Sequence, residues 1–291
     1  MEQKAASGGM APKFCIAGTA LGYSLQGVTL KFISCSPLAF NGMEKLLCFI
    51  FLGMARRSFR IRFSKEAIPG AIFLYLSSVL FMAANKMTTA ANAVILQYTN
   101  PIFVILISGL FLHHKIRKKD VLFVCAMMGG MVLFFLDDIG VGSMLGNGIA
   151  ILSGVAMALS NVYAHHGKAD VGEYAMINCM ISMAVGLLSA LFFPPHLTWQ
   201  TAGGAAFYGI FCSGLPLWLF SRGAPRVRPL EISMLLMLEP VCGPLWVALI
   251  VGELPGKMAL AGAAVIFGAL AFQLILPMAE ERKDRFEYRK G

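Results

Sequence analysis

The sequence predicts an all-α polytopic membrane protein, with ten transmembrane helices in two inverted five-helix repeats around a central cavity. Three observations lead to this prediction. The chain of 291 residues is 58% hydrophobic and only 13% charged, whereas soluble domains are about 45–50% apolar and about 25% charged. Apolar stretches long enough to cross a bilayer follow one another along the chain. A motif of the first half also recurs in the second half.

The transmembrane segments follow from the length of the apolar stretches. A spanning helix needs about 20 predominantly apolar residues, and ten stretches meet this requirement. The fifth is the shortest, and it is expected to begin earlier than its apolar part, near Lys119. Short connections predict antiparallel neighbours and leave no room for a soluble domain. The predicted segments are 14–33, 38–55, 67–84, 89–112, 121–136, 145–164, 174–193, 202–221, 230–251 and 257–277.

The basic residues predict the orientation. Lys and Arg are enriched in cytoplasmic loops, and most of the 24 in this chain fall on one side if the N-terminus is cytoplasmic. They gather in the stretches 56–65, 115–119 and 222–228 and in the basic tail, residues 278–291. We therefore expect a multi-pass protein of the inner or plasma membrane with both termini in the cytoplasm. Because the net charge of +9 reflects sidedness, no nucleic-acid partner is expected.

The internal repeat is recognised from the similar stretches that contain two helical prolines. Asn100 and Pro101 open an apolar stretch followed by a turn and a further span, and Glu239 and Pro240 open a similar stretch. Five helices per half is an odd number, so the second half must enter the membrane from the opposite side, as in many transporters. Helices 4 and 9 are expected to cross near the membrane centre, with Asn100 and Glu239 at comparable depths. The predicted repeats are residues 14–137 and 145–277.

The motif at residues 239–262, which reads Glu-Pro, then Trp, then Gly-Glu, then Gly, resembles the EamA-type pattern of the drug/metabolite transporter superfamily. The weaker partner at residues 100–130 resembles it too, and the resemblance covers residues 14–277. It implies a ten-helix fold of two EamA repeats around a central cavity, and transport of small metabolites, often as export. Inverted repeats suit this activity because the halves can exchange conformations and expose a midplane site to each side in turn.

Charged side chains inside a bilayer are costly, about 2.5–3.5 kcal/mol each on insertion scales, and are functional candidates. Glu239 is the strongest, because Pro240 follows it and frees the carbonyl of Leu236. A carboxylate beside an opened backbone predicts proton coupling, and a structural role in a kinked helix is the alternative. Glu44 is the second candidate for proton coupling. Adjacent helical residues point in different directions, so Glu44 and Lys45 are not expected to form a face-to-face pair, and a structural ion pair is the alternative to a functional role for Glu44.

Uncharged polar and aromatic side chains within the spans are candidates for lining the substrate cavity, with helix–helix hydrogen bonding as the open alternative. Pro216 is expected to break the eighth span, and the GxxxG motif of Gly18 and Gly22 is expected to allow close packing. The predicted substrate-cavity residues are Tyr23, Gln26, Gln97, Asn100, Ser160, Asn161, Tyr208, Trp218 and Trp246.

Catalytic and metal motifs are missing from the sequence. The seven cysteines are scattered without a CxxC pair, and the pairs His113–His114 and His165–His166 lack a nearby residue to complete a metal site. No Walker A sequence occurs, so ATP-driven transport is not expected. The sequence therefore predicts no enzyme, no cofactor and no metal.

The predicted function is secondary transport by alternating access. The expected substrates are small amphipathic or zwitterionic metabolites, such as amino-acid-like compounds or drugs, and the expected direction is export. Protons are the candidate coupling ion, and uncoupled exchange or facilitated diffusion is the alternative. A membrane-embedded enzyme and a scaffold are remote alternatives. The expected partners are the substrate and the lipid bilayer. The chain is expected to be a monomer or a homodimer.

Overall fold

The computed structural model describes residues 10–26, 29, 37–61, 63–88, 90–111, 118–136, 143–167, 169–192, 198–251 and 256–288. These residues form helices joined by short turns, with no strand among them, which confirms the all-α class.

The first half of the chain contains six described helices. They are α1 (Met10–Ser24), α3 (Pro37–Ala55), α4 (Ala67–Met87), α5 (Ala90–Gln97), α6 (Asn100–Phe111) and α7 (Lys118–Phe134). The second half holds α8 (Met144–His166), α9 (Val171–Phe192), α10 (Trp199–Phe207), the π-helical turn η2 (Tyr208–Gly214), α11 (Leu215–Gly223), the 3-10 turn η3 (Ala224–Arg226), α12 (Pro229–Leu236), α13 (Leu238–Val251) and α14 (Lys257–Tyr288).

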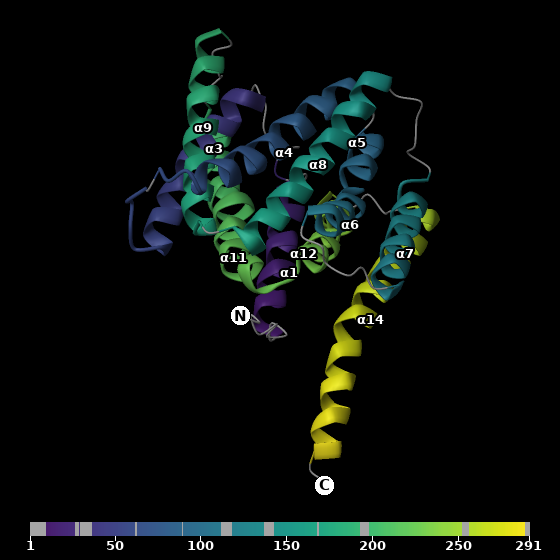
Figure 1. Cartoon of the computed structure of the whole chain (residues 1–291). Coiled ribbons are helices and arrows are strands. Elements are labelled where there is room, and N and C mark those ends of the chain that lie inside the picture. Colours follow the sequence, from purple (N-terminus) through teal and green to yellow (C-terminus); the bar gives the residue numbers. More distant parts are fainter. Residues whose placement is uncertain are drawn as a thin grey trace.

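Each of the ten expected segments contains one helix or a run of consecutive helical pieces. Helix α7 begins at Lys118, so the shortest segment does start early. Among the described residues, five stretches are long and apolar enough to cross a membrane, and the count of ten stays a prediction. Those five stretches are Ala67–Ala84, Asn92–Leu110, Met144–His166, Val171–Phe192 and Trp199–Arg226. The predicted tail continues α14 as a helix to Tyr288 and extends away from the other helices (Figure 1).

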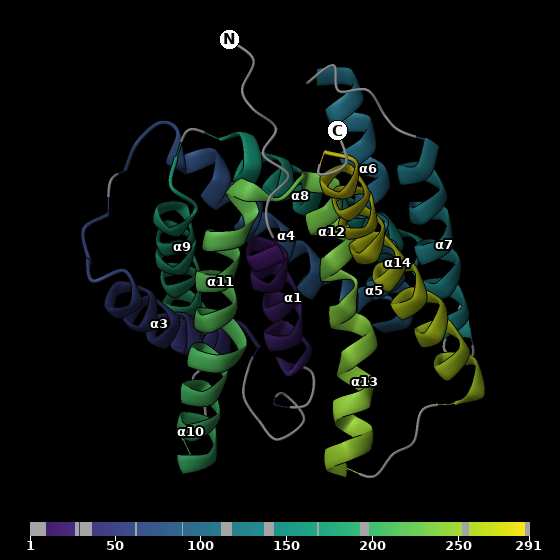
Figure 2. The same cartoon turned by 90° about the horizontal axis from the view of Figure 1, so that it is seen from below.

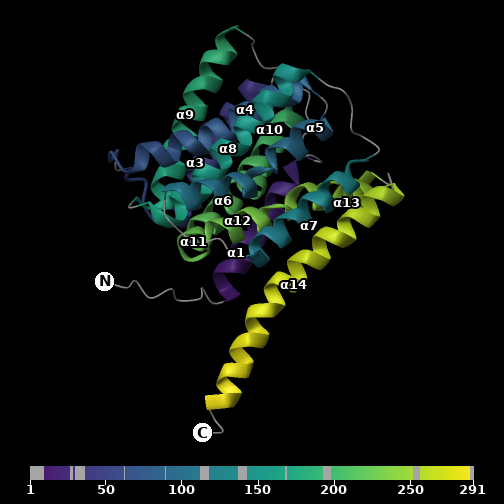
Figure 3. The same ribbon diagram turned by 45° about the vertical axis from the view of Figure 1, so that its right-hand side comes forward.

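The two halves are interleaved. Helix α1 packs against α11, α12 and α13 of the second half, between which it lies in Figure 2. Helix α8 packs in the same way against α4, α5 and α6 of the first half. Helix α4 also packs against α9, and the counterpart of this contact is the packing of η2 against α3. The pairs α3–α9 and α7–α14 join corresponding helices (α7 and α14 run side by side in Figure 3), and α6 and α12 join the two corresponding proline-containing spans. These contacts of α1 and α4 thus have counterparts made by the corresponding helices of the other half.

Corresponding helices run antiparallel. Near the middle of the α3–α9 pair, Cys48 Sγ lies 3.5 Å from Cys179 Sγ. Toward the start of α3 and the end of α9, a Cβ atom on Gly42 would lie 2.8 Å from Gly186 Cα. In the α7–α14 pair, the ring of Phe123 near the start of α7 lies 5.8 Å from that of Phe272, whereas Phe134 at the end of α7 packs against Gly262, near the start of α14. In both pairs, the start of one helix therefore lies toward the end of its partner.

The two helices with an internal proline are interrupted at corresponding points. The break between α5 and α6 lies at Tyr98 and Thr99, and the break between α12 and α13 lies at Met237. Pro101 lacks an N–H group, which frees the carbonyl of Gln97. A Cβ atom on Gly154 of α8 would lie 2.7 Å from that carbonyl oxygen, so the glycine lets α8 approach the opened backbone.

The eighth span is continuous but distorted, so the expected break at Pro216 is replaced by a bulge. The π-helical turn η2 leads directly into α11, which has Pro216 in its first turn. Because Pro216 has no N–H group, the carbonyl of Cys212 is free, and it accepts a hydrogen bond from Gln26 Nε2 at 2.9 Å. A π-bulge is a common way for a helix to absorb such an irregularity.

Close packing at the GxxxG motif is confirmed. A Cβ atom on Gly22 would lie 2.4 Å from Pro216 Cγ, and one on Gly18 would lie 3.0 Å from a methyl carbon of Leu219. Helix α1 can therefore approach α11 closely, as small residues allow in membrane bundles.

Candidate functional site

Glu239 accepts a hydrogen bond from the other half of the chain. Tyr98 Oη donates to Glu239 Oε2 at 2.7 Å. Tyr98 lies in the α5–α6 break and is 3% exposed, whereas Glu239 lies in the first turn of α13. The two helix breaks thus meet, and a neutral phenol fixes one oxygen of a partly buried carboxylate. Asn100, expected as the counterpart of Glu239, instead donates to Met157 Sδ at 3.1 Å.

Glu44 and Lys45 form an ion pair, which is the structural alternative that the sequence left open for Glu44, although the two neighbours were not expected to face each other. Lys45 Nζ lies 2.8 Å from Glu44 Oε1 and donates to Ser213 Oγ of η2 at 3.2 Å. The four-carbon lysine stem is long and flexible enough to bring its ammonium group back to the neighbouring carboxylate. Glu44 is 2% exposed, and its Oε2 has no hydrogen-bond partner among the described residues. Most buried polar groups in proteins have a hydrogen-bond partner, so this oxygen is an exception among the described residues.

Two tyrosines lie near these charged groups. Tyr23 of α1 is within electrostatic range of both Lys45 and Glu239. Tyr208 of η2 is within range of Glu44, Lys45 and Glu239, and its ring packs edge-on against Phe40 with centroids 5.4 Å apart. Both halves thus contribute to one group of side chains, which we call the central polar cluster. Its members are Tyr23, Glu44, Lys45, Tyr98, Tyr208, Ser213 and Glu239.

Several other predicted cavity residues bond neighbouring helices instead. Gln97 Nε2 donates to Ser153 Oγ at 2.7 Å, and Ser153 in turn donates to the carbonyl of Ser77 at 2.9 Å. Asn161 Nδ2 donates to Ser233 Oγ at 2.9 Å. Ser160 is buried on α8 beside Asn161. These contacts join α8 to α4, α5 and α12, which is the packing alternative left open by the sequence.

The remaining candidates lie around α1 and α11. Gln26 bonds the carbonyl freed by Pro216, as described above. Trp246 Nε1 of α13 donates to Ser24 Oγ of α1 at 2.8 Å. Trp218 lies under Arg222, whose guanidinium carbon is 4.9 Å from the ring centroid. Of the eleven predicted site residues, the structure brings Tyr23, Glu44, Tyr208 and Glu239 into one cluster.

Tyr98, Lys45 and Ser213 are the cluster members that were not predicted as site residues. Tyr98 stands two residues before Asn100, just where a helix opens ahead of a proline. A side chain at such an opening can contact a different neighbour than the helical period predicts. The position of Tyr98 three residues before Pro101 is therefore the sequence signal that could have identified it. Ser213 lies in η2, where the π-helical turn shifts the face on which each side chain emerges.

The described residues hold no group of three or more His, Cys, Asp or Glu side chains that could bind a metal ion. The rings of His165 and His166 pack edge-on, with centroids 4.6 Å apart. His113 and His114 lie outside the described residues.

The comparisons with known proteins agree with this architecture. A model of the EamA-like transporter family matches residues 12–136 and again residues 144–275. An uncharacterized transporter of Archaeoglobus fulgidus is 25% identical over 205 residues, which are 69% of this chain and 73% of that protein. A crystal structure with 17% sequence identity shares the fold with a TM-score of 0.80, covering 94% of this chain and 99% of the other.

Two matches of one family model along one chain show the repeat architecture. The apolar helices and the transporter relative support a multi-pass membrane transporter with a small-molecule substrate. The chain belongs to the EamA-like transporter family.

Proposed function

We propose that the chain is a secondary transporter that exports small zwitterionic or amphipathic metabolites by alternating access, with the central polar cluster as the substrate site. One observation carries the proposal. Lys45, which contacts Glu44 and Ser213, and Glu239, which contacts Tyr98, come from opposite halves of the chain, and both lie near Tyr23. A site that presents both signs of charge matches a zwitterion such as an amino acid.

The donors and acceptors of the cluster support this substrate class. The Lys45 ammonium has three N–H donors, of which Glu44 and Ser213 take two. The third is available for a substrate carboxylate. Glu239 uses one oxygen to accept from Tyr98, and its other oxygen is available for a substrate ammonium group. The rings of Tyr23, Tyr208 and Phe40 offer apolar surface to the rest of the substrate.

Transport in liposomes by Lys45→Gln tests this assignment. Three substrates are compared. An apolar amino acid carries both charges, its amide carries only the positive charge, and its N-acetyl derivative carries only the negative charge. We expect the wild type to prefer the amino acid, because only a zwitterion satisfies both charges. Lys45→Gln should lose at least about tenfold for the amino acid, the range of a lost charge-assisted hydrogen bond.

The amide is the internal control in this experiment. It has no carboxylate for Lys45 to bind, so its transport should change little in Lys45→Gln. An equal loss for the amino acid and the amide would show that Lys45 acts through folding or through Glu44 rather than through the substrate.

The proposed topology has ten spanning helices in inverted repeats, residues 14–137 and 145–277, in the inner or plasma membrane, with both termini in the cytoplasm. Antiparallel packing of corresponding helices supports inversion. Two halves with the same orientation in the membrane would place α3 and α9 parallel to each other. Arg56, Lys118 and Arg228 lie at ends of helices that this topology puts in the cytoplasm, as basic side chains favour.

Cysteine labelling tests the orientation. On a cysteine-free background, Gly140→Cys and His196→Cys should react with an impermeant maleimide added outside cells, because both lie in predicted outward loops. Arg60→Cys and Lys118→Cys should react only after the cells are opened. The reverse pattern would overturn the orientation without affecting the repeat.

The second candidate function is uncoupled exchange or facilitated diffusion. The observation that favours it is the Tyr98–Glu239 hydrogen bond, because a carboxylate fixed by a tyrosine can serve to hold two helix breaks together. The Glu239 substitution argued in the Discussion separates it from proton coupling.

A further inference from the structure

Ion pairs between different helices concentrate at one end of the bundle, and each joins the two halves of the chain. Lys13 of α1 lies 3.3 Å from Glu231 of α12. Arg228, just before α12, lies 3.6 Å from Asp120 of α7. Arg56, after α3, lies 2.9 Å from Asp170, just before α9. We call this the charged end.

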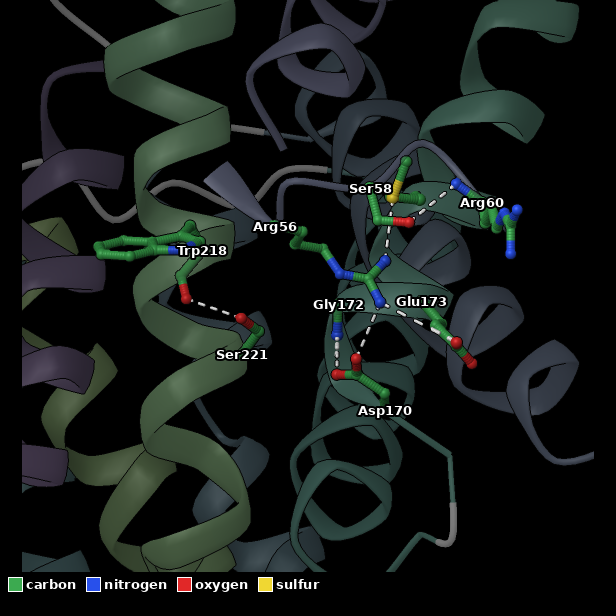
Figure 4. Close-up of polar contacts among 9 residues, drawn as sticks. Arg56, Ser58, Arg60, Asp170, Gly172, Glu173, Trp218 and Ser221 are labelled. Atoms are coloured by element: carbon green, nitrogen blue, oxygen red, sulfur yellow. Dashed lines mark hydrogen bonds and ion pairs between the residues drawn. The ribbon is translucent and has the colours of Figure 1, made fainter. Parts of the chain in front are cut away.

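Helix α11 connects these groups. It packs against both α3 and α9, and Trp218 and Ser221 of α11 are drawn beside the Arg56 group in Figure 4. At its last residue, Gly223, a Cβ atom would lie 2.7 Å from the carbonyl oxygen of Pro12, next to Lys13. The cross-half ion pairs therefore lie at the same end of the molecule.

Arg56 makes the most extensive of these contacts (Figure 4). Its Nη2 donates to Asp170 Oδ2 at 2.9 Å and lies 4.0 Å from Glu173 Oε1. Its Nη1 lies 3.0 Å from Met176 Sδ, one turn further along α9. The guanidinium group thus spans the first turn of α9 while its own backbone belongs to the end of α3.

The end of α3 is shaped to place Arg56. Ser58 N–H donates to the carbonyl of Gly53, and Arg57 N–H donates to that of Met54, which together form a Schellman cap. Arg57 occupies the left-handed position of this cap, with φ 54°. Glycine usually takes that position, and a side chain there costs about 1 kcal/mol or more. Strain of this kind is typical of functional segments.

The start of α9 is shaped to receive Arg56. Asp170 Oδ1 accepts from Gly172 N–H at 2.9 Å, so the same carboxylate that binds Arg56 also caps the helix. A Cβ atom on Gly172 would lie 2.9 Å from Arg56 Nε. Glycine at this position therefore lets the arginine lie flat across the helix start.

The opposite end of the α3–α9 pair is built differently. There the backbones approach closely at Gly42 and Gly186, where a Cβ atom on Gly42 would lie 2.8 Å from Gly186 Cα. The turn after α9, which corresponds to the turn containing Arg56, has Pro194 and Pro195 in sequence and no Lys or Arg. One end of the pair is thus held by small residues and the other by a breakable ion pair.

We propose that Arg56, Asp170 and Glu173 form a clamp that closes the transporter at the charged end, and that this clamp must open for the substrate site to face that side. The inference rests on the alternating access proposed above. The α3–α9 pair joins corresponding helices of the two halves, so a relative motion of the halves changes this contact first. Separation about the Gly42–Gly186 contact would move Arg56 farthest from α9.

A buried reporter cysteine tests the clamp without any substrate. Ala175 is fully buried on α9, in the same apolar cluster as Leu52 of α3. On a cysteine-free background in liposomes, Ala175→Cys is treated with a charged methanethiosulfonate reagent. We expect Arg56→Gln and Asp170→Asn to raise the labelling rate roughly two- to fivefold, the range that exposed ion pairs contribute. Asparagine keeps the helix cap, and Arg56→Lys should restore most of the protection.

The matched control is Arg60→Gln. Arg60 is an exposed arginine of the same turn, and its side chain forms no ion pair within the described part of the chain. It should leave the labelling rate unchanged. Leu52→Cys gives a second reporter from the other helix. Equal rates in all variants, or an equal increase in Arg60→Gln, would overturn the clamp. Labelling that responds to Arg56 in a protein that transports none of the tested substrates would overturn the proposed function and leave the clamp standing.

Discussion

Glu239→Gln is expected to abolish transport driven by a pH gradient while substrate exchange continues. Glu44 is neutralised by Lys45 at 2.8 Å, whereas the partner of Glu239 within the described chain is the neutral hydroxyl of Tyr98. Burying an unneutralised carboxylate in a membrane is costly. Glu239 is therefore the member of the central polar cluster whose charge is stabilised most by binding a proton or, alternately, a cationic substrate group. Glutamine matches the protonated acid in size and hydrogen bonding but cannot release a proton.

The measurement compares two fluxes in the same liposomes. Uptake driven by an imposed pH gradient should fall to background, and counterflow of labelled substrate without a gradient should be weakened by the lost contact to the substrate ammonium group but remain measurable. Tyr98→Phe is the matched control, because it removes the hydrogen bond to Glu239 but leaves the carboxylate, so that gradient-driven uptake persists. If Glu239 only holds the two helix breaks together, Glu239→Gln will lower thermal stability and the folded protein will still respond to the gradient. Undiminished gradient-driven flux would make Glu44 the next residue to test.

The positions of the helices could be predicted from the sequence because hydropathy and proline chemistry act locally. Pro101 and Pro240 each remove a backbone donor, and the breaks at Tyr98 and Met237 lie just before them. The irregular eighth span could be predicted only in part. Pro216 indicates a freed carbonyl, but the bulge depends on Gln26, a residue of another helix, which bonds Cys212.

The composition of the central polar cluster was harder to predict, since it depends on rotamers and on contacts between distant helices. The Cα–Cβ directions of the neighbours Glu44 and Lys45 diverge and argue against face-to-face pairing, yet the flexible lysine side chain can bend back to the carboxylate. Gln97 and Asn161 have the composition expected of cavity residues, but each bonds a serine of an adjacent helix. Polar residues in a span thus serve packing as often as they serve a substrate.

Gly262→Ala is expected to cost about 1–3 kcal/mol of stability, the usual range for overpacking. An added Cβ atom would lie 2.4 Å from Phe134 N and 2.6 Å from the carbonyl oxygen of Gly130, both backbone atoms of α7. Backbone atoms cannot rotate out of the way as a side chain can, so α7 and α14 would have to move apart. Ile266, which is fully buried at this contact, would then lose part of its packing.

Gly268→Ala on α14 and Gly129→Ala on α7 are the matched controls. A Cβ atom on either glycine would meet nothing within 4 Å, and alanine favours the helix over glycine by about 1 kcal/mol. Thermal unfolding of the purified variants should therefore give a lower midpoint for Gly262→Ala and an unchanged or higher midpoint for both controls. Equal midpoints would mean that α7 and α14 do not pack this closely. Because α7 and α14 are corresponding helices of the two repeats, that result would also remove one of the two antiparallel pairs on which the inverted arrangement rests.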